Sequence, residues 1–376
     1  MEDRLRYLEP QRPAGEKVAG QDALIVAHRR TVVWYVLLLG LGGCGERRAR
    51  TAHESPTNPA DSSYAVAPAD TTYSDPAAHR AGYASSAGVR IHYLDFGGTG
   101  DPLVFLTGLG SSAHIFDDIA PRFTDSFRVL AITRRGHAES DHPLTGFVLD
   151  TLVADLKAVL DTLGLRQVNL AGHSIAGGEL TRFAILYPDR VAKLIYLDAL
   201  LRADELESLI AEDSIRVRAT GADFATYQSA RSWFQRCFFG FWSPALETDF
   251  RLNTTPSTTT DIIFKDAARS PAWRQDYSGI RMPVLILYTL ATLKQRRPCV
   301  AGSPDRDRAR RAQAFLDRRY RPYQLESVVQ VSRQMPNAKV VEIKNGHHFL
   351  FVSNQDMVVQ EMRRFLLDES GVRPGK

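Results

Sequence analysis

Short apolar runs alternate with helical patterns along this 376-residue chain beyond about residue 80. Most of the runs are continuously apolar, as expected for parallel strands that are buried on both faces. Strands that alternate with helices are typical of a mostly parallel sheet covered by helices, so the sequence predicts an α/β fold. The runs predicted to be strands are Val89 to Asp95, Leu103 to Thr107, Arg128 to Thr133, Gln167 to Ala171, Lys193 to Leu197, Pro283 to Tyr288 and Lys339 to Ile343.

Two of the intervening segments carry apolar residues at helical spacing. The first lies between the third and fourth runs and is predicted to cover the sheet. The second follows the last run and is predicted to close the domain near Asp368. Their apolar positions are Leu149, Leu152, Val153, Leu156, Val159, Leu160 and Leu163 in the first, and Met357, Val358, Met362, Phe365 and Leu366 in the second.

The alternation stops between about residues 200 and 281, where some eighty residues contain helical stretches instead. We interpret this segment as a cap inserted between the strands Lys193 to Leu197 and Pro283 to Tyr288. It contains an aromatic cluster, which either packs the cap onto the domain or lines a pocket. The cluster consists of Trp233, Phe234, Phe238, Phe239, Phe241 and Trp242.

The composition excludes some classes of partner. Hydrophobic residues make up 44% and charged residues 24%, which suits a globular chain with a sizeable core. Lys and Arg number 47 against 43 Asp and Glu, and no long basic run is present, so a nucleic-acid partner is not expected. Cys44, Cys237 and Cys299 have neither the pairing nor the histidine spacing of a zinc site. The sequence therefore predicts no metal and no cofactor.

The predicted strand that ends at Ala171 runs into a sharp turn around Ser174, and a helical pattern starts near Glu179. A nucleophile on such a turn is held in strained backbone geometry with its oxygen exposed, and small residues two positions to either side let the chain pass. Those positions hold Gly172 and Ala176 here. We therefore predict that Ser174 is a nucleophile; the alternative is a serine that only caps the helix.

With this motif, residues 82–368 resemble the α/β-hydrolase superfamily, although glycine is usual at the position of Ala176. The resemblance implies an α/β-hydrolase fold, that is, a mostly parallel sheet flanked by helices, with the cap between its sixth and seventh strands. It also implies a serine hydrolase, because the epoxide hydrolases and haloalkane dehalogenases of this fold use an aspartate nucleophile.

Cleavage of an ester or amide also needs donors for the oxyanion that develops, commonly two backbone N–H groups. The residue after the nucleophile, Ile175, is the first predicted donor. The segment Thr107 to Gly110 resembles the family's His-Gly-X segment with threonine in place of histidine, so Leu109 is the second predicted donor. An ordinary glycine turn is the alternative for this segment.

A serine hydroxyl is a weak nucleophile and requires an adjacent base. Asn345 to Phe349 follow a predicted strand and precede the last helix, where this family places its histidine. His348 is the predicted base, because the family's base is commonly followed by an aromatic residue. His347 is the alternative.

The third residue orients the imidazole and has to be a carboxylate. The family usually supplies it just after the strand Pro283 to Tyr288, but no acid stands there in this sequence. Asp198, at the end of the strand Lys193 to Leu197, is the predicted acid, because some members of the superfamily place the acid there. Asp305 or Asp307, in a polar loop farther on, is the alternative.

These residues predict a serine hydrolase that cleaves a small or medium carboxylic ester through an acyl-enzyme. Amidase, thioesterase, carbon–carbon hydrolase and perhydrolase reactions stay open, because one fold hosts many reactions. An alternative from another class is a non-catalytic, surface-anchored binding protein, which the missing acid after the strand Pro283 to Tyr288 suggests.

The segment Thr31 to Gly43 is apolar, follows Arg29 and Arg30, and ends before Cys44. About a dozen apolar residues suffice for a signal peptide but fall short of the ~20 needed to span a bilayer. The layout resembles a bacterial lipoprotein signal peptide. It implies lipidation of Cys44 and export to the periplasmic or outer face of a membrane, with membrane contact only through this anchor. A short buried helix or a retained membrane anchor is the alternative.

The predicted division of the chain is a signal segment over 1–44, a linker over 45–80, a catalytic domain over 81–368 and a tail over 369–376. The linker is rich in Ala, Ser, Thr, Pro and Asp, and it cannot bury enough apolar surface to fold. If the protein is exported, Cys237 and Cys299 could form a disulfide, since oxidising compartments favour it. Two unrelated buried thiols are the alternative.

Overall fold

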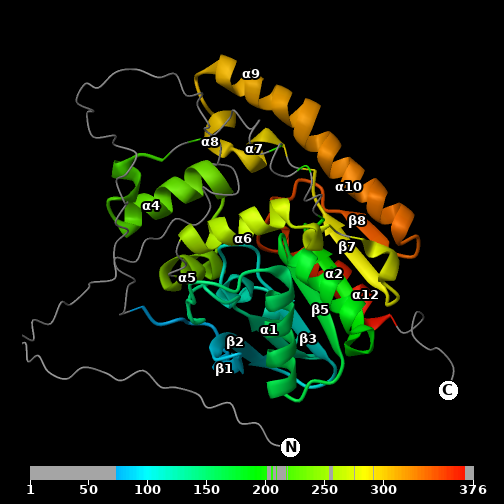
Figure 1. Ribbon diagram of the computed structural model, residues 1–376. Helices are drawn as coiled ribbons and strands as arrows, with labels where there is room; N and C mark the ends of the chain where they lie inside the picture. The colour runs from blue at the N-terminus through cyan, green and yellow to red at the C-terminus, as the bar shows by residue number, and fades with distance from the viewer. Residues whose placement is uncertain are drawn as a thin grey trace, which may run out of the picture.

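A computed structural model describes residues 73–368 of the chain, apart from 201–204, 206–208, 210–216, 218, 254–256, 275 and 291. Within these residues the strands form one eight-stranded sheet in the order β1-β2-β4-β3-β5-β6-β7-β8 (Figure 1). Every pair from β4 to β8 is parallel, which confirms the predicted fold class. The strands are β1 (Arg80–Ser86), β2 (Val89–Gly97), β3 (Pro102–Leu106), β4 (Arg128–Ile132), β5 (Val168–His173), β6 (Val191–Leu197), β7 (Val284–Tyr288) and β8 (Lys339–Glu342).

The edge strand β1 has no counterpart among the predicted strands. Its sequence is rich in small residues and carries no apolar run. It pairs antiparallel with β2, which itself pairs antiparallel with β4. Ala87 and Gly88 join β1 to β2 with φ values of 48° and 81°, the positive angles that a two-residue hairpin turn requires. The strand thus forms through a local turn rather than through hydrophobic patterning.

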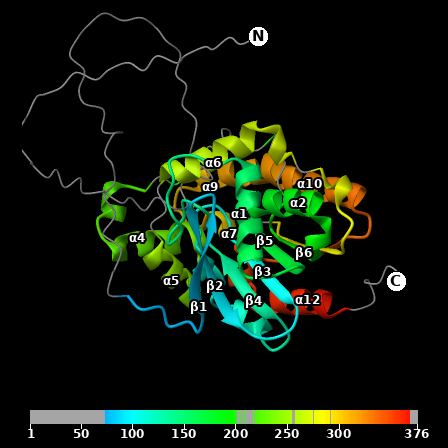
Figure 2. The same cartoon turned by 60° about the horizontal axis from the view of Figure 1, so that its bottom comes forward.

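Helices cover both faces of the sheet (Figure 2). On one face, α1 (Leu149–Thr162) and α2 (Ala176–Leu186) pack on side chains such as Val104 and Leu106. On the other, α12 (Gln355–Leu367) and the short helix η3 (Ala113–Phe116) pack on Leu103 and Phe105. Successive residues of β3 therefore enter different cores, as the twofold period of a strand requires.

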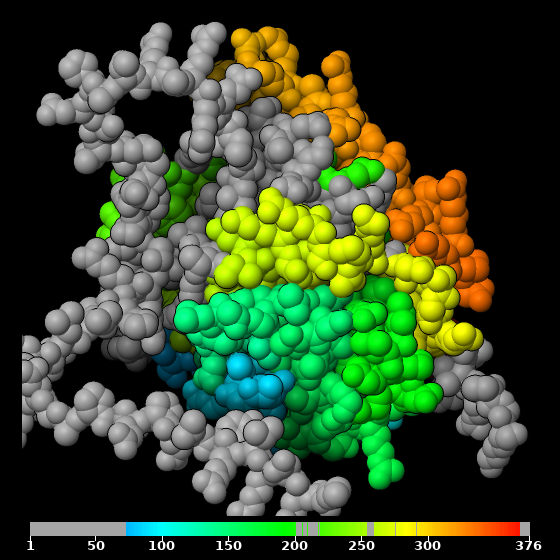
Figure 3. All heavy atoms as spheres, in the orientation of Figure 1, coloured from blue at the N-terminus to red at the C-terminus, as the bar shows by residue number. Residues whose placement is uncertain are grey.

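The predicted cap lies between β6 and β7. Its aromatic residues belong mostly to the core that also contains η3 and α12, so they pack the cap onto the domain. Its helix α6 lies across α1 and α2 and forms a continuous surface with them (Figure 3). The cap's helices are η6 (Gly221–Phe224), α4 (Tyr227–Phe234), η7 (Gln235–Phe239), α5 (Pro244–Leu252), α6 (Ser257–Arg269), η8 (Pro271–Trp273) and η9 (Tyr277–Gly279).

A second helical excursion, which the sequence patterning does not predict, separates β7 from β8 (Figure 1). Its core is small and includes Val300, Phe315 and Tyr323 together with Leu209 from the cap. Its helices are short or polar, and the first long one, Arg306–Phe315, is rich in arginine, so the buried side is too narrow to dominate the pattern. They are α7 (Leu293–Arg296), α8 (Pro298–Ala301), α9 (Arg306–Phe315), η10 (Leu316–Tyr320) and α10 (Arg321–Gln334).

Cys237 in η7 and Cys299 in α8 are free thiols that meet where the cap contacts this second excursion. Burial, together with a hydrogen bond to Cys237, raises the pKa of the Cys299 thiol to about 12. The two cysteines that the sequence offers as a pair are therefore neighbours, and both are reduced in this structure.

The predicted signal segment, with Cys44, and the tail over 369–376 lie outside the described residues. Among the helices of the described part, none combines the length and the apolar character needed to cross a membrane. The last residues of the predicted linker contact the domain, because Tyr73 Oη lies 2.8 Å from Thr248 Oγ1 of α5.

Gly177, in the first turn of α2, lies against the chain that leaves β6. A Cβ atom there would lie 2.0 Å from the Ala199 carbonyl oxygen. This oxygen belongs to the backbone, so it cannot easily move away from the added atom. We expect Gly177→Ala to lower the free energy of unfolding by about 2 kcal/mol or more, as overpacked sites do. Urea denaturation followed by circular dichroism measures it.

Gly302→Ala is the matched control, since the nearest atom to its Cβ would be the Pro298 carbonyl oxygen at 3.6 Å. We expect a change within about 0.5 kcal/mol for this variant. Equal stability of the two variants would show that α2 does not require this close approach.

Candidate active site

Ser174 lies on a sharp turn between β5 and α2. Its φ of 56° is in the left-handed region, which non-glycine residues rarely adopt and which is concentrated at functional sites. The turn is fixed because the Ser174 N–H donates to the Leu197 carbonyl of the neighbouring strand at 3.2 Å. A Cβ at Gly172 would lie 3.1 Å from the Ala176 Cβ, so the glycine on one side makes room for the alanine on the other.

Ser174, His348 and Asp198 form one hydrogen-bonded chain. His348 Nε2 lies 2.9 Å from Ser174 Oγ, and His348 Nδ1 lies 2.7 Å from Asp198 Oδ2. The three residues follow β5, β8 and β6, so they meet at the carboxyl edge of the sheet, where open α/β sheets bind ligands. Because a carboxylate can only accept, Nδ1 carries the proton and Nε2 is free to accept from the Ser174 hydroxyl.

Asp198, rather than Asp305, is the carboxylate next to the histidine. Its Oδ1 accepts from the Thr289 N–H at 3.1 Å, and Thr289 is the residue directly after β7. β6 and β7 are adjacent and parallel, so the ends of both strands lie side by side. Asp305 instead caps α9 by accepting from the Arg308 N–H at 2.9 Å, and Asp307 pairs with Arg310.

His347 is buried and has both ring nitrogens engaged. Its Nε2 donates to the Phe238 carbonyl at 3.2 Å, and its Nδ1 accepts from the Phe349 N–H at 3.1 Å. Burial, with the nearby His348 charge adding to it, lowers the pKa of His347 to about 3. This neighbour therefore holds the loop as a neutral imidazole and does not face Ser174.

His173 steadies the other side of His348. Its Nε2 donates to the His348 carbonyl at 3.0 Å, and the two rings are 4.6 Å apart. Burial lowers the pKa of His173 well below its usual range, so the ring is neutral. The histidine next to the serine thus positions the loop of His348.

The loop after β3 passes close to the turn of Ser174. A Cβ at Gly108 would lie 2.5 Å from His173 Nδ1 and 3.3 Å from Ser174 Cβ, so only glycine fits. This approach brings Leu109 to the site, and Ile175 follows Ser174 directly. Within the described part of the chain, no hydrogen bond uses the N–H of Leu109 or Ile175. Both predicted donors are therefore free to bind an oxyanion.

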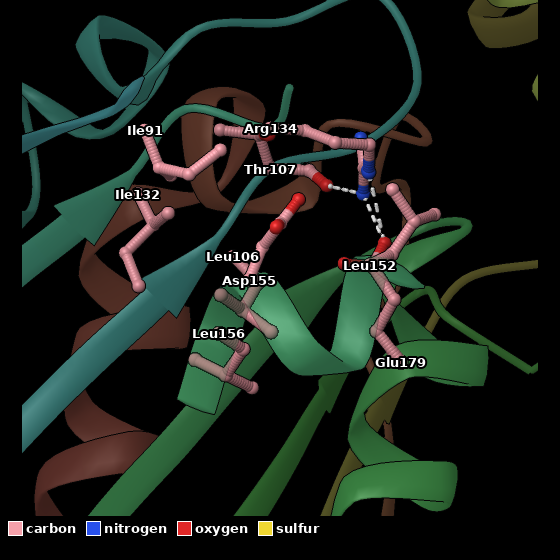
Figure 4. A pocket seen from close by; sticks show the side chains of 9 residues that line it. All are labelled: Ile91, Leu106, Thr107, Ile132, Arg134, Leu152, Asp155, Leu156 and Glu179. Carbon is pink, nitrogen blue, oxygen red and sulfur yellow. Dashed lines mark hydrogen bonds and ion pairs between the residues drawn. The ribbon is translucent and has the colours of Figure 1, made fainter. Parts of the chain in front are cut away.

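Arg134, in the segment that follows β4, braces this loop. Its guanidinium donates to the Gly108 carbonyl at 3.1 Å. It also donates to the Thr107 carbonyl at 2.8 Å (Figure 4). It also forms a buried ion pair with Glu179 of α2. The arginine therefore ties the loop of Leu109 to the helix that follows Ser174. Its position after a β-strand could have suggested a structural role, but its partners are 26 and 45 residues away.

A small internal cavity lies beside this brace, between α1 and the sheet (Figure 4). It measures about 20 Å³, room for about one water molecule. Its lining includes Ile91, Leu152 and Asp155. This cavity is too small for an organic substrate.

Comparisons with known proteins fit this geometry. A family profile described as alpha/beta hydrolase fold matches residues 101–290, about half of the chain. The chain belongs to the α/β-hydrolase fold family. The matched segment of this α/β hydrolase contains the Ser174 turn and the strands β3 to β7.

Among its curated relatives, this α/β hydrolase is 42% identical over 118 residues to a non-heme chloroperoxidase of Streptomyces lividans, covering 31% of the chain and 43% of that protein. A protein of Mycobacterium phage D29 named “putative non-heme haloperoxidase” is matched over only 37% of its length, so the chain spans less than half of the length of these two relatives. It is 22% identical over 271 residues to a 2-(acetamidomethylene)succinate hydrolase of Mesorhizobium japonicum, covering 72% of the chain and 89% of that enzyme.

Solved structures show the same fold at low sequence identity. A carboxylesterase of Bacillus subtilis superposes with a TM-score of 0.54 at 17% identity, covering 79% of this chain and 94% of that one. At this identity the likeness establishes the α/β-hydrolase fold alone.

The neutral state of His347 predicts acid sensitivity. Its pKa of about 3 in the folded protein lies below the ordinary value of 6.5, so the unfolded chain binds the proton first. The contribution of neutral His347 to the free energy of unfolding is therefore complete above pH 6.5 and is lost as the pH falls toward 3. At pH 5 the loss is about 2 kcal/mol. Urea denaturation at pH 7.5 and pH 5 measures the loss.

We expect His347→Gln, although less stable at pH 7.5, to lose less free energy of unfolding than the native protein between these two pH values. His142→Gln, on the exposed loop after β4, is the control and should keep the native loss. A native-sized loss in His347→Gln would contradict the burial of a neutral imidazole at this position.

Proposed function

We propose that this protein is a serine hydrolase that cleaves a small or medium carboxylic ester through an acyl-enzyme. The observation that carries the proposal is the pair of short contacts at His348, 2.9 Å to Ser174 Oγ and 2.7 Å to Asp198 Oδ2. This arrangement matches the roles of nucleophile, base and orienting acid in a Ser-His-Asp triad.

The reaction follows from the contacts. His348 Nε2 takes the hydroxyl proton while Ser174 Oγ attacks the ester carbonyl, and the N–H groups of Leu109 and Ile175 bind the oxyanion. The intermediate collapses, the His348 imidazolium protonates the departing alcohol, and Ser174 keeps the acyl group. His348 then deprotonates a water molecule as its oxygen attacks the acyl carbon, the bond from that carbon to Ser174 Oγ breaks, and the imidazolium returns the proton to Oγ, which releases the acid and restores Ser174. Asp198 stabilises the imidazolium in both halves.

A second candidate keeps the same acyl-enzyme but uses hydrogen peroxide in place of water. Attack of peroxide on the acyl group would release a peracid and restore Ser174, and the peracid would oxidise halide. The similarity to a non-heme chloroperoxidase over 118 residues favours this candidate. Peroxide-dependent bromination in an acetate buffer tests it, and hydrolysis without bromination rejects it.

Two further proposals follow from the sequence. We propose the chain division given above, and we propose that lipidated Cys44 anchors the protein on the periplasmic or outer face of a bacterial membrane. Mass spectrometry of the mature N-terminus tests the anchor: an unmodified chain that retains Met1 rejects it. The alternative of a non-catalytic binding protein was suggested by the missing acid after β7. The contact between Asp198 and His348 argues against that alternative, because it supplies a carboxylate from the end of β6.

A fluorophosphonate probe tests the nucleophile. We expect the native protein to be labelled at Ser174 within minutes, because His348 removes the hydroxyl proton during attack, and we expect no labelling of Ser174→Ala. Intact-mass spectrometry detects the adduct, and circular dichroism checks that Ser174→Ala is folded. A folded native protein that stays unlabelled would exclude the serine hydrolase.

The variant Asp198→Asn tests whether Asp198 is the acid of the triad. It adds little backbone strain, since asparagine tolerates the positive φ of 47° at this position. We expect kcat for a nitrophenyl ester to fall about 10³- to 10⁴-fold, as when the histidine of a triad loses its carboxylate. Asp305→Asn is the matched control and should keep kcat within about twofold. A loss in Asp305→Asn and none in Asp198→Asn would reverse the assignment.

A further inference from the structure

Four side chains that are separate from the proposed active site converge on one point. Asp75 and His79 lie on the irregular segment before β1, His114 lies on η3, and Asp117 follows η3 directly. One nitrogen or carboxylate oxygen from each lies within 4.8 Å of all the others. Figures 1 and 2 show the segment before β1 approaching the domain on the side of α5.

The spacing of these atoms resembles that of ligands around a metal ion. His79 Nε2 and His114 Nδ1 lie 2.7 and 2.8 Å from Asp75 Oδ2, and Asp117 Oδ2 lies 3.3 Å from His114 Nδ1. Zinc binds nitrogen and carboxylate oxygen at about 2.0–2.2 Å in a tetrahedron, which sets its ligand atoms about 3.3 Å apart. Small side-chain adjustments would therefore produce that geometry.

Asp117 contains an atom that lacks a partner. Its side chain is only 5% exposed, and its Oδ1 has no hydrogen-bond donor among the described residues. This oxygen lies 3.9 Å from His79 Nε2, inside the cluster. A buried carboxylate oxygen without a donor is costly, and a cation held between Asp117 and His79 would satisfy it.

Glu139 supplies an outer partner. Its Oε1 lies 3.2 Å from His114 Nε2, the ring nitrogen that faces away from the cluster. With a cation in the cluster, His114 would keep its Nε2 proton for Glu139 and present the lone pair of Nδ1 to the ion. A histidine that binds a metal with one nitrogen and donates to a carboxylate with the other is a recurrent arrangement in metal sites.

We propose that Asp75, His79, His114 and Asp117 bind one structural zinc ion. Two imidazoles favour zinc over calcium or magnesium, which prefer oxygen ligands. Four protein ligands close the coordination shell, as in structural rather than catalytic zinc sites. The two carboxylates balance the two charges of the ion, so the buried site is neutral with both histidines unprotonated.

The ion would fasten the segment before β1 to the start of η3. That start is also held by the cap, because Ser112 donates its N–H and its hydroxyl to Asp249 of α5 at 2.8 and 2.6 Å. Ser112 belongs to the same loop as Leu109. Zinc therefore ties the N-terminal segment to the loop that carries a proposed oxyanion donor, without touching Ser174 or His348. This inference is independent of the proposed function.

The test is metal analysis of the full chain. After expression with zinc and dialysis, we expect mass spectrometry to find about one zinc per chain. After treatment with a chelator, zinc chloride should raise Tm by several degrees, whereas calcium or magnesium chloride should not. Absence of bound zinc together with no rise in Tm on adding zinc would overturn the proposal. An equal rise with calcium would overturn the choice of metal.

Four variants locate the site. Asp117→Asn and His79→Gln should retain less than a fifth of the zinc and lose the zinc-dependent rise in Tm. Asp118→Asn and His142→Gln change the adjacent aspartate and a histidine outside the cluster, and both should keep the native zinc content. Native zinc content in Asp117→Asn and His79→Gln would place the metal elsewhere. The result for the chelated native protein does not depend on whether any variant folds.

Discussion

The parallel pairing of β5 with β6 determines where the proposed active site lies. At the end of these strands, Ser174 and Asp198 both adopt left-handed backbone conformations, with φ values of 56° and 47°. Each is held by the next strand: the Ser174 N–H donates to Leu197, and the Asp198 N–H donates to Leu287. Sheet hydrogen bonds therefore sustain two strained residues at one edge, and the loop after β8 only has to bring His348 between them.

The sequence predicted the strands and helices that bury a wide apolar side, and it predicted the turn that small residues mark. Short apolar runs, most of them continuous, identified the strands from β2 to β8, and the small residues around Ser174 identified the turn. β1 was missed because it consists largely of small residues, and the excursion α7–α10 was missed because its helices are short or, like the arginine-rich α9, polar with a narrow apolar side. Local patterning cannot detect an element that is stabilised mainly by its neighbours.

Residues that act across long sequence separations were harder to predict. Arg134 contacts Thr107 and Glu179, which lie on different elements, and nothing in its local sequence indicates either. The cluster of Asp75, His79, His114 and Asp117 was also missed, because the expectation of no metal came from the three cysteines alone. The spacings Asp75 to His79 and His114 to Asp117 were the available signal, and only the fold brings the two pairs together.

The placement of the carboxylate after β6 has a consequence for the chain that follows β7. There, Thr289 contributes a backbone N–H to Asp198 and a hydroxyl to the Gly346 carbonyl at 2.9 Å, and neither contact needs an acidic side chain. The excursion that begins a few residues later therefore does not have to supply the carboxylate that contacts His348. Its length and sequence can diversify, and with them its contacts with the cap, while the charge network at His348 stays the same.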